Sequence, residues 1–188
     1  MLILASASPR RRELLTQAGF EFQVHPAHIP EDTLPGEDPI AYVTRLAREK
    51  AEAVFQILAG EPSGRTTIVL GADTTVTLDH HILGKPKNPA DAARMLRLLS
   101  GRTHRVITGV ALVSAHRAQA IAEVTEVEFL PLSETQIQSY IATGEPNDKA
   151  GAYAIQGRAA RWIPRIRGCY FNVVGLPISR VSTLLEAW

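Results

Sequence analysis

The sequence is poor in cysteine, in aromatic residues and in net charge. A single cysteine among 188 residues excludes an internal disulfide and is compatible with a reducing compartment. Aromatic residues make up 6% of the chain, and the formal net charge is +1, from 20 Lys and Arg against 19 Asp and Glu. The chain therefore lacks the basic, aromatic-interleaved surface that binds nucleic acid and the charge excess that binds an anionic membrane. Any anion site must be local.

The sequence also lacks long hydrophobic runs. No apolar stretch approaches the length of a membrane-spanning helix, and the N-terminal one ends at Ala5 before polar residues and arginines, unlike a signal peptide. We therefore expect a cytoplasmic protein that binds no membrane. With 45% hydrophobic residues the chain is an ordinary globular one, large enough for one domain or two small lobes. Cys169 is expected to be a buried apolar residue.

Strands and helices are predicted to alternate along the chain, which is typical of α/β proteins. Helices are predicted over residues 10–18, after the caps Asp38-Pro39 and Asn88-Pro89, after a capping box at Ser133, and after Pro177. Strands are predicted over residues 20–24, 67–76, 103–113 and 123–129, with a polar connection over 60–65. The apolar face of the second helix is marked by Ile40, Val43, Ala47, Val54 and Leu58.

The N-terminal stretch combines serines, a proline and three arginines. A short apolar run ends at Ser6-Ala7-Ser8, and Pro9 stands where a helix would begin. The helix N-terminus offers free backbone N–H groups, and Arg10 to Arg12 oppose its dipole unless an anion joins them. Two interpretations stay open: an anion-binding corner, or a solvated basic helix start with Ser8 as an ordinary N-cap.

One carboxylate stands where an acid is unexpected. The run from Thr67 to Val76 is typical of a strand buried on both faces, yet Asp73 interrupts it. Interior carboxylates are rare unless they are paired, hydrogen-bonded or bound to a metal, so Asp73 is the leading candidate for a catalytic acid or base. The alternative is a carboxylate that accepts hydrogen bonds from a turn just past the strand end.

Two lysines and a loop carboxylate are further candidates. Lys50 falls on the apolar face of the second helix, so it must either snorkel to the edge, the commoner outcome, or point at a negative partner. Lys85 lies between Gly84 and Pro86, a combination that also occurs in many surface turns. Glu31 stands in a proline-rich segment suited to fold over a cleft, where it is either a ligand or, as is commoner for one loop carboxylate, a solvated acid.

The stretch from Gly144 to Gly157 is the least ordinary in the chain. It gathers glycines, two acids, a lysine and Gln156 around a short apolar core. This composition is typical of an irregular loop whose backbone approaches something closely, with a long structural turn as the alternative. One cysteine and scattered histidines give no zinc site.

Several motifs occur together along the chain: Ser6-Ala7-Ser8-Pro9-Arg10-Arg11, Gly71-Ala72-Asp73-Thr74-Thr75-Val76, Gly84-Lys85-Pro86, Ser100-Gly101-Arg102-Thr103-His104, Gly144-Glu145-Pro146 with Asp148-Lys149-Ala150-Gly151-Ala152-Tyr153, Ile155-Gln156-Gly157 and Asn172-Val173-Val174-Gly175-Leu176-Pro177. In this order they resemble the motifs of the Maf family of nucleoside triphosphate pyrophosphatases. The pattern from Asp148 to Gln156 resembles the subgroup that hydrolyses dTTP and UTP.

The resemblance implies a two-lobed α/β fold of the Maf/ITPase-like type, with a mixed sheet and a central cleft. Residues 1–188 would form a single domain whose two α/β lobes flank the nucleotide-binding cleft. It further implies a divalent metal cation, a cytoplasmic setting and, often, a homodimer.

The resemblance also assigns roles by position. Asp73 would be the proton acceptor, and substrate preference would be set by Arg11, Thr74 and Gln156. The anion would be contacted by Ser8, Arg11, Lys50 and Lys85. Asp73 and Glu31 are the candidate carboxylate ligands for Mg²⁺ or Mn²⁺, which prefer hard oxygen donors.

The implied reaction is attack of water on the α-phosphorus of dTTP or UTP, or of a modified pyrimidine nucleotide. It releases the nucleoside monophosphate and pyrophosphate, and so keeps aberrant nucleotides out of nucleic acids. The alternative function is a non-catalytic nucleotide-binding regulator of cell division or septum formation.

Overall fold

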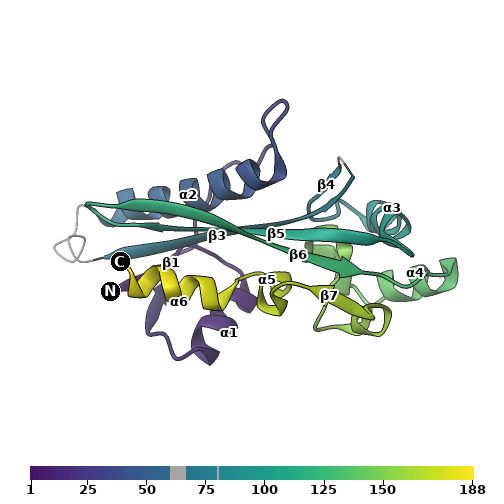
Figure 1. Ribbon diagram of the computed structural model, residues 1–188. Helices are drawn as coiled ribbons and strands as arrows, with labels where there is room; N and C mark the ends of the chain where they lie inside the picture. The colour runs from purple at the N-terminus through teal and green to yellow at the C-terminus, as the bar shows by residue number, and fades with distance from the viewer. Residues whose placement is uncertain (60–66, 80) are drawn as a thin grey trace. The chain divides into compact units, whose positions relative to one another are not determined.

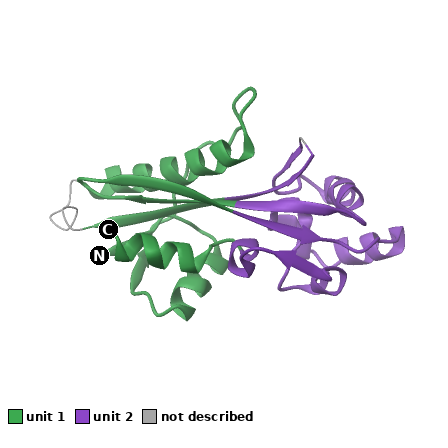
Figure 2. Ribbon diagram, in the orientation of Figure 1, with its two compact units in different colours: residues 1–73, 108–123, 175–188 green, residues 74–107, 124–174 purple. Residues whose placement is uncertain are grey.

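The computed structural model describes residues 1–59, 67–79 and 81–188, so the polar connection predicted over residues 60–65 and His80 lie outside the described residues. The chain divides into two compact units (Figure 2). Unit 1 comprises residues 1–73, 108–123 and 175–188, and unit 2 comprises residues 74–107 and 124–174.

The elements alternate as the sequence predicts (Figure 1). The strands in the described residues are β1 (Leu2–Leu4), β2 (Phe22–Val24), β3 (Ile68–Leu78), β4 (His81–Leu83), β5 (Thr103–Val113), β6 (Ala118–Glu128) and β7 (Arg165–Arg167). The helices are α1 (Pro9–Gln17), α2 (Pro39–Leu58), α3 (Pro89–Leu99), α4 (Glu134–Ile141), α5 (Tyr170–Val174) and α6 (Ile178–Glu186). Short 3₁₀ helices are η2 (Glu145–Asp148), η3 (Ala150–Ala152) and η4 (Arg158–Trp162).

The strands form a mixed sheet, which confirms the predicted α/β class. Hydrogen-bonded neighbours follow the order β2-β1-β3-β5-β6-β7, and β4 pairs with β3. β1 runs parallel to β2 and β3, whereas the β3–β4 and β6–β7 pairs are antiparallel. The first halves of β3 and β6 and the second half of β5 belong to unit 1, and the other halves belong to unit 2.

The predicted helix caps are confirmed. Asp38 accepts hydrogen bonds from the backbone N–H groups of Ile40 and Ala41, and Asn88 accepts one from Asp91. Ser133 and Gln136 form the reciprocal capping box that their spacing predicts. A side chain that binds free N–H groups locally fixes where each helix begins, which is why these boundaries could be predicted.

Three local predictions are wrong. Ile40 is 41% exposed because it lies in the first turn of α2, before the apolar face of the helix meets the sheet. Cys169 is only half-buried, since it lies in the segment that joins β7 to α5. The last long strand begins at Ala118 rather than residue 123, because the turn after β5 is tight and its Ser114 N–H already donates to the Arg117 carbonyl.

In unit 1, α2 covers one face of the sheet and α1 and α6 cover the other (Figure 1). Small apolar residues of α2 pack on the strands in a core cluster made of Ile3, Ala5, Ala47, Ala51, Val54, Val69, Ala111 and Val113. This choice of alanine and valine brings the helix close to the strands.

Two glycines set the distance between α2 and the sheet. A Cβ built on Gly71 of β3 would lie 2.0 Å from the Ala47 carbonyl oxygen, and one on Gly109 of β5 would lie 2.1 Å from the Val43 carbonyl oxygen. No side chain fits at either position, because the obstacle is helix backbone. The glycines therefore allow α2 to lie directly against β3 and β5.

Replacing Gly71 with alanine is expected to destabilise the protein. The new methyl group must push α2 off β3, which is overpacking and costs about 1–3 kcal/mol of unfolding free energy or more. Gly84→Ala is the matched control, because a Cβ there meets nothing within 4 Å. Urea unfolding of both variants measures the difference, and equal midpoints would contradict this account of the packing.

Unit 2 has its own core. Its cluster combines residues of α3 and α4 with strand residues and with the irregular segment that follows α4, and includes Val76, Leu96, Val127, Ile137, Tyr140, Tyr153 and Trp162. The Tyr140 and Trp162 rings meet edge to face with centroids 5.3 Å apart. The irregular segment is thus packed from inside by large side chains.

Candidate functional site

Asp73 lies in the middle of β3, which continues past it to Leu78. The alternative of an acid in a turn past the strand end is therefore wrong. Asp73 is 8% exposed, and its carboxylate Oδ1 accepts a hydrogen bond of 2.7 Å from Nζ of Lys50, which is 7% exposed. A buried charge is tolerated when it is paired, so each of the two groups makes the other acceptable in the core.

Lys50 points at negative partners and does not snorkel. Its position one residue before Ala51, where α2 rests on Gly71, brings it over β3 and hence to Asp73. Its Nζ also lies 2.6 Å from Oε1 of Glu31, whose side chain is 50% exposed. One ammonium group therefore joins a buried carboxylate and a half-exposed one.

Glu31 belongs to a segment without regular secondary structure between β2 and α2. Its backbone carbonyl accepts a hydrogen bond of 2.9 Å from the Tyr42 hydroxyl, and the next carbonyl, that of Asp32, accepts one of 3.0 Å from Arg45. Burial raises the pKa of Tyr42 to about 12, and the charges of Asp73 and Glu31 act in the same direction. The Tyr42 hydroxyl consequently stays protonated and remains a donor.

Arg11 lies inside the corner formed by β1 and α1. Its Nε donates to the Gly175 carbonyl at 2.9 Å, and its Nη1 donates to the Ala72 carbonyl at 2.7 Å and to Ser6 Oγ at 3.1 Å. Burial lowers the pKa of Arg11, while the charges of Asp73 and Glu31 oppose that shift. The guanidinium is thus a fixed cation within electrostatic range of both carboxylates.

The corner differs from a solvated basic helix start. Ser8 stands at the N-cap of α1, but its side chain makes no capping hydrogen bond, and its backbone N–H donates to Ser6 Oγ at 3.2 Å. Of the three arginines, Arg11 is buried, and Arg10 lies 3.5 Å from Glu13 on the surface. The interpretation of Ser8 as an ordinary N-cap is wrong, and anion binding by Ser8 and Arg11 stays a prediction.

The other three candidates lie in unit 2. Thr74 is half-buried on β3, and Lys85 and Gln156 are exposed. The Lys149 ammonium lowers the pKa of Asp148, and the charge of Lys85 adds to that shift. The Gly151 N–H donates to the Gly84 carbonyl at 3.1 Å, so the backbone next to Lys85 contacts the irregular segment. The expected cleft and the roles of these three residues stay predictions.

The segment from Gly144 to Gly157 is irregular, as predicted, and contains the two short 3₁₀ helices η2 and η3. Gly144 and Gly151 have positive φ values of 74° and 67°, which glycine adopts without strain. A Cβ on Gly151 would lie 2.9 Å from Val76, and one on Gly157 would lie 2.0 Å from the Glu145 carboxylate. Gly151 and Gly157 thus approach side chains of unit 2 itself, so packing within the unit explains why glycine stands at both positions.

Two hydrogen-bonded groups hold this segment. The Glu145 carboxylate accepts from the Tyr140 hydroxyl at 2.6 Å and from the Arg158 backbone N–H at 3.1 Å. The Tyr153 hydroxyl lies 2.8 Å from Nε2 of His104, and burial lowers the pKa of His104 to about 4, so this imidazole is neutral at pH 7. The turn that carries Gln156 is therefore supported on both sides.

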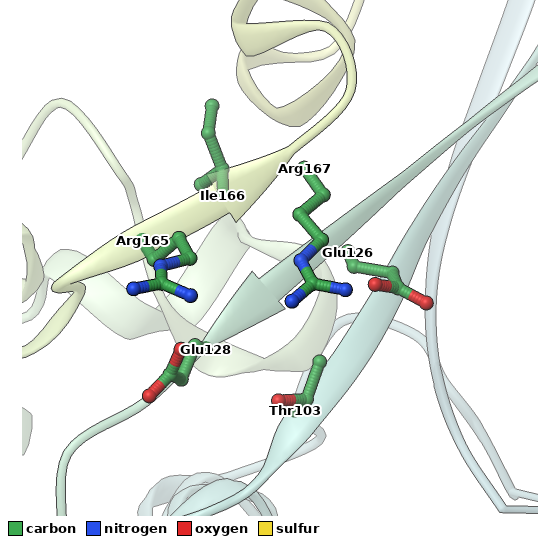
Figure 3. Close-up of a pocket in the computed structure, with 6 residues that line it drawn as sticks. All are labelled: Thr103, Glu126, Glu128, Arg165, Ile166 and Arg167. Atoms are coloured by element: carbon green, nitrogen blue, oxygen red, sulfur yellow. The ribbon is translucent and has the colours of Figure 1, made fainter.

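A separate pocket in unit 2 contains none of the candidate residues. Figure 3 shows Arg165 and Arg167 of β7 on the side that faces Glu126, Glu128 and Thr103, with Ile166 on the other side. The antiparallel register sets Glu126 opposite Arg167 and Glu128 opposite Arg165. Acids and bases are equal in number, so this pocket has no net charge to attract a triphosphate.

Sequence reasoning missed Ser6, Tyr42 and Arg45 as parts of the site. The Ser6 hydroxyl lies beside the arginine-rich helix start, where a serine is a natural acceptor for a guanidinium. Tyr42 and Arg45 stand three residues apart on α2 and thus on one face. That spacing was a signal, but the backbone carbonyls they bind have no sequence signature.

The fold has a counterpart among solved structures. The structure of the Staphylococcus aureus Ham1 protein matches with a TM-score of 0.53 at 11% sequence identity, and the match covers 99% of this chain and 98% of that one. At this identity the likeness establishes the fold alone.

The family is defined by the sequence. Residues 1–188 match the model of the family described as Maf-like protein. The chain therefore belongs to the Maf-like family, as its motifs indicate.

Similar proteins cover nearly the whole chain. A protein named dTTP/UTP pyrophosphatase from Koribacter versatilis is 54% identical over 185 residues, which are 98% of this chain and 93% of that protein. A protein of the same name from Geobacter sulfurreducens is 53% identical over 96% of this chain and 92% of its own length. Another from Bacillus pumilus is 46% identical over 100% of this chain and 96% of its own length.

Within residues 1–59, 67–79 and 81–188, no helix is long and apolar enough to cross a membrane.

Proposed function

We propose that this protein is a nucleoside triphosphate pyrophosphatase that hydrolyses dTTP and UTP to the nucleoside monophosphate and pyrophosphate. The observation that carries the proposal is the buried Asp73 carboxylate in mid-strand, held by Lys50 beside Glu31, in a chain about half identical to proteins of that name. A family that acts on triphosphates needs such a base close to fixed cations.

The proposed chemistry balances at the α-phosphorus. Lys50 binds Oδ1 of Asp73, so we assign Oδ2 as the atom that takes a proton from the attacking water. The water oxygen forms a bond to the α-phosphorus while the bridging bond to the β-phosphate breaks, and pyrophosphate leaves with that bonding pair. Lys50 and Arg11 supply positive charge where negative charge develops.

The carboxylates fit a divalent cation. Glu31 and Asp73 already converge on one cationic centre, the Lys50 ammonium, at 2.6 and 2.7 Å. Mg²⁺ is commonly held by one or two carboxylates together with substrate phosphates. When bound, the metal supplies charge that polarises the phosphates.

We propose a cytoplasmic setting for this protein. A single cysteine and a net charge of +1 support a cytoplasmic protein that binds free nucleotides and neither nucleic acid nor membrane. The family resemblance supports a homodimer, which we include in the proposal. Light scattering on the protein as it elutes from a size-exclusion column measures its mass in solution, and a mass of two chains is expected.

A nucleotide panel tests the activity. The purified protein is incubated with Mg²⁺ and each of dTTP, UTP, CTP, ATP and GTP, and monophosphate and pyrophosphate are quantified. Running the reaction in ¹⁸O-labelled water places the label in the monophosphate if water attacks the α-phosphorus. Label in pyrophosphate would contradict the proposed chemistry, and binding without turnover would support the non-catalytic regulator.

Lys50→Ala and Lys85→Ala are each expected to lower kcat/KM for UTP roughly 10-fold to 150-fold. This factor corresponds to about 1.5–3 kcal/mol of lost transition-state stabilisation, which is the range for a hydrogen bond to a charged group. Lys87→Ala is the control for Lys85, because Lys87 is an exposed lysine two residues away. Unchanged kinetics in Lys85→Ala would make Lys85 an ordinary surface residue.

A further inference from the structure

Two side chains of α2 hold two consecutive carbonyls of the segment that carries Glu31. The Tyr42 hydroxyl donates to the Glu31 carbonyl at 2.9 Å, and Arg45 Nη2 donates to the Asp32 carbonyl at 3.0 Å. Because Tyr42 and Arg45 are three residues apart, they lie on the same face of the helix. The backbone is thus held at the residue whose carboxylate reaches Lys50.

The two side chains are themselves fixed. Arg45 Nε and Nη2 bind the two oxygens of Glu37 at 2.6 and 2.7 Å, and the guanidinium lies 5.7 Å from the centroid of the Tyr42 ring. The bond to Arg45 lowers the pKa of Glu37 to about 2, so the pair is intact at neutral pH. Glu37 belongs to the same segment as Glu31, and Arg45 therefore binds this segment at two places.

This support reduces the conformational freedom of Glu31. A half-exposed carboxylate on an irregular segment has several rotamers and a mobile backbone available, and ordering it costs entropy. Its Oε1 nevertheless lies 2.6 Å from Lys50 Nζ. Fixing the Glu31 backbone by Tyr42 and that of Asp32 by Arg45 removes the backbone part of that freedom before a ligand arrives.

We propose that Tyr42 and Arg45 are positioning residues that hold the Glu31 carboxylate in place for the divalent cation and the triphosphate. The inference rests on the proposed function, because it assigns these residues to the site where Glu31 and Asp73 would bind the metal. Neither residue touches the reacting atoms in this arrangement, and both act through the backbone that carries Glu31.

Tyr42→Phe tests the first residue by removing one hydroxyl. The dissociation constant for Mn²⁺, measured by electron paramagnetic resonance without nucleotide, is expected to rise about 10-fold, as is typical when a supporting hydrogen bond to a metal ligand is lost. Thr44→Val is the matched control, since its hydroxyl donates only within α2, to the Ile40 and Ala41 carbonyls, in the contacts described. Thermal unfolding establishes that both variants are folded.

Arg45→Met tests the second residue, with Arg48→Met as its control. Arg48 also pairs with a carboxylate, at 2.6 Å, but its partner is Glu52 within α2. Only Arg45→Met is expected to weaken Mn²⁺ binding and to lower kcat for UTP. Equal effects of the two arginine variants would reduce the role of Arg45 to general helix stability and overturn its assignment.

A double-mutant comparison shows whether Tyr42 acts through Glu31. In a Glu31→Gln background, Tyr42→Phe is expected to have almost no further effect on Mn²⁺ affinity or kcat. Fully additive effects would overturn the inference, and so would wild-type behaviour of Glu31→Gln. If the unmodified protein hydrolyses no nucleotide, the proposed function fails, while the Mn²⁺ affinities of Tyr42→Phe and Thr44→Val still decide the positioning role.

Discussion

Asp73→Asn is expected to lower kcat for UTP by about two to four orders of magnitude, the range that general acid–base catalysis contributes. The amide keeps the size of the carboxylate and one oxygen that accepts from Lys50, but it cannot take a proton from water. Nucleotide binding should survive in part, because Arg11 and Lys50 remain. Single-turnover kinetics with UTP, together with calorimetric binding of a non-hydrolysable analogue, separate the two effects.

The fold should tolerate this substitution. After Asp73→Asn, Lys50 still has Glu31 at 2.6 Å and so is not left as an unpaired buried charge. Asp79→Asn is the matched control: Asp79 is exposed and paired with Arg102 at 2.8 Å, so its loss should leave turnover unchanged. A folded Asp73→Asn protein with near wild-type kcat would remove Asp73 from the chemistry.

Local signals explain why most of the fold could be predicted. Asp38, Asn88 and Ser133 bind the N–H groups beside them, so the sequence alone determines where those helices begin. Asp73 stood out because a charge in a buried strand requires a partner. Lys50 stood out for the same reason, because it lies on the apolar face of a helix. In the structure the two buried charges pair with each other.

The rest of the site depends on contacts between residues far apart in the sequence. Arg11 is satisfied by carbonyls of Ala72 and Gly175, which any residue could supply. Glu31 is placed by hydrogen bonds to backbone carbonyls at 31 and 32, and these too leave no trace in residue type. Gly71 did carry a signal, since a glycine inside a strand indicates close backbone approach, here by α2.

The second large expected effect concerns the base. Uracil and thymine present an N3–H donor beside a carbonyl at C4, whereas cytosine presents the reverse pair, an acceptor and an amino donor. A site built for the first pattern leaves two polar groups unpaired with the second, at about 1–3 kcal/mol each. The total of about 2–6 kcal/mol corresponds to roughly 30-fold to 10⁴-fold in kcat/KM. We therefore expect dTTP and UTP to be hydrolysed faster than CTP by that factor, and much faster than ATP or GTP.

Gln156 is the residue to which this preference is assigned. Its amide can pair with the uracil edge through one acceptor and one donor, but an amide turned by 180° pairs equally well with cytosine. Strong discrimination therefore requires that the amide be held in one orientation when substrate binds, and the turn that carries it is braced by Glu145 and Tyr153.

Gln156→Leu should lose both rate and the preference for UTP over CTP. Gln138→Leu is the control, since this exposed glutamine of α4 binds only Glu134 in the contacts described. Comparable kcat/KM for CTP and UTP in the unmodified enzyme would contradict the assignment, and unchanged selectivity in Gln156→Leu would move recognition to backbone groups of the Gly144 to Gly157 segment.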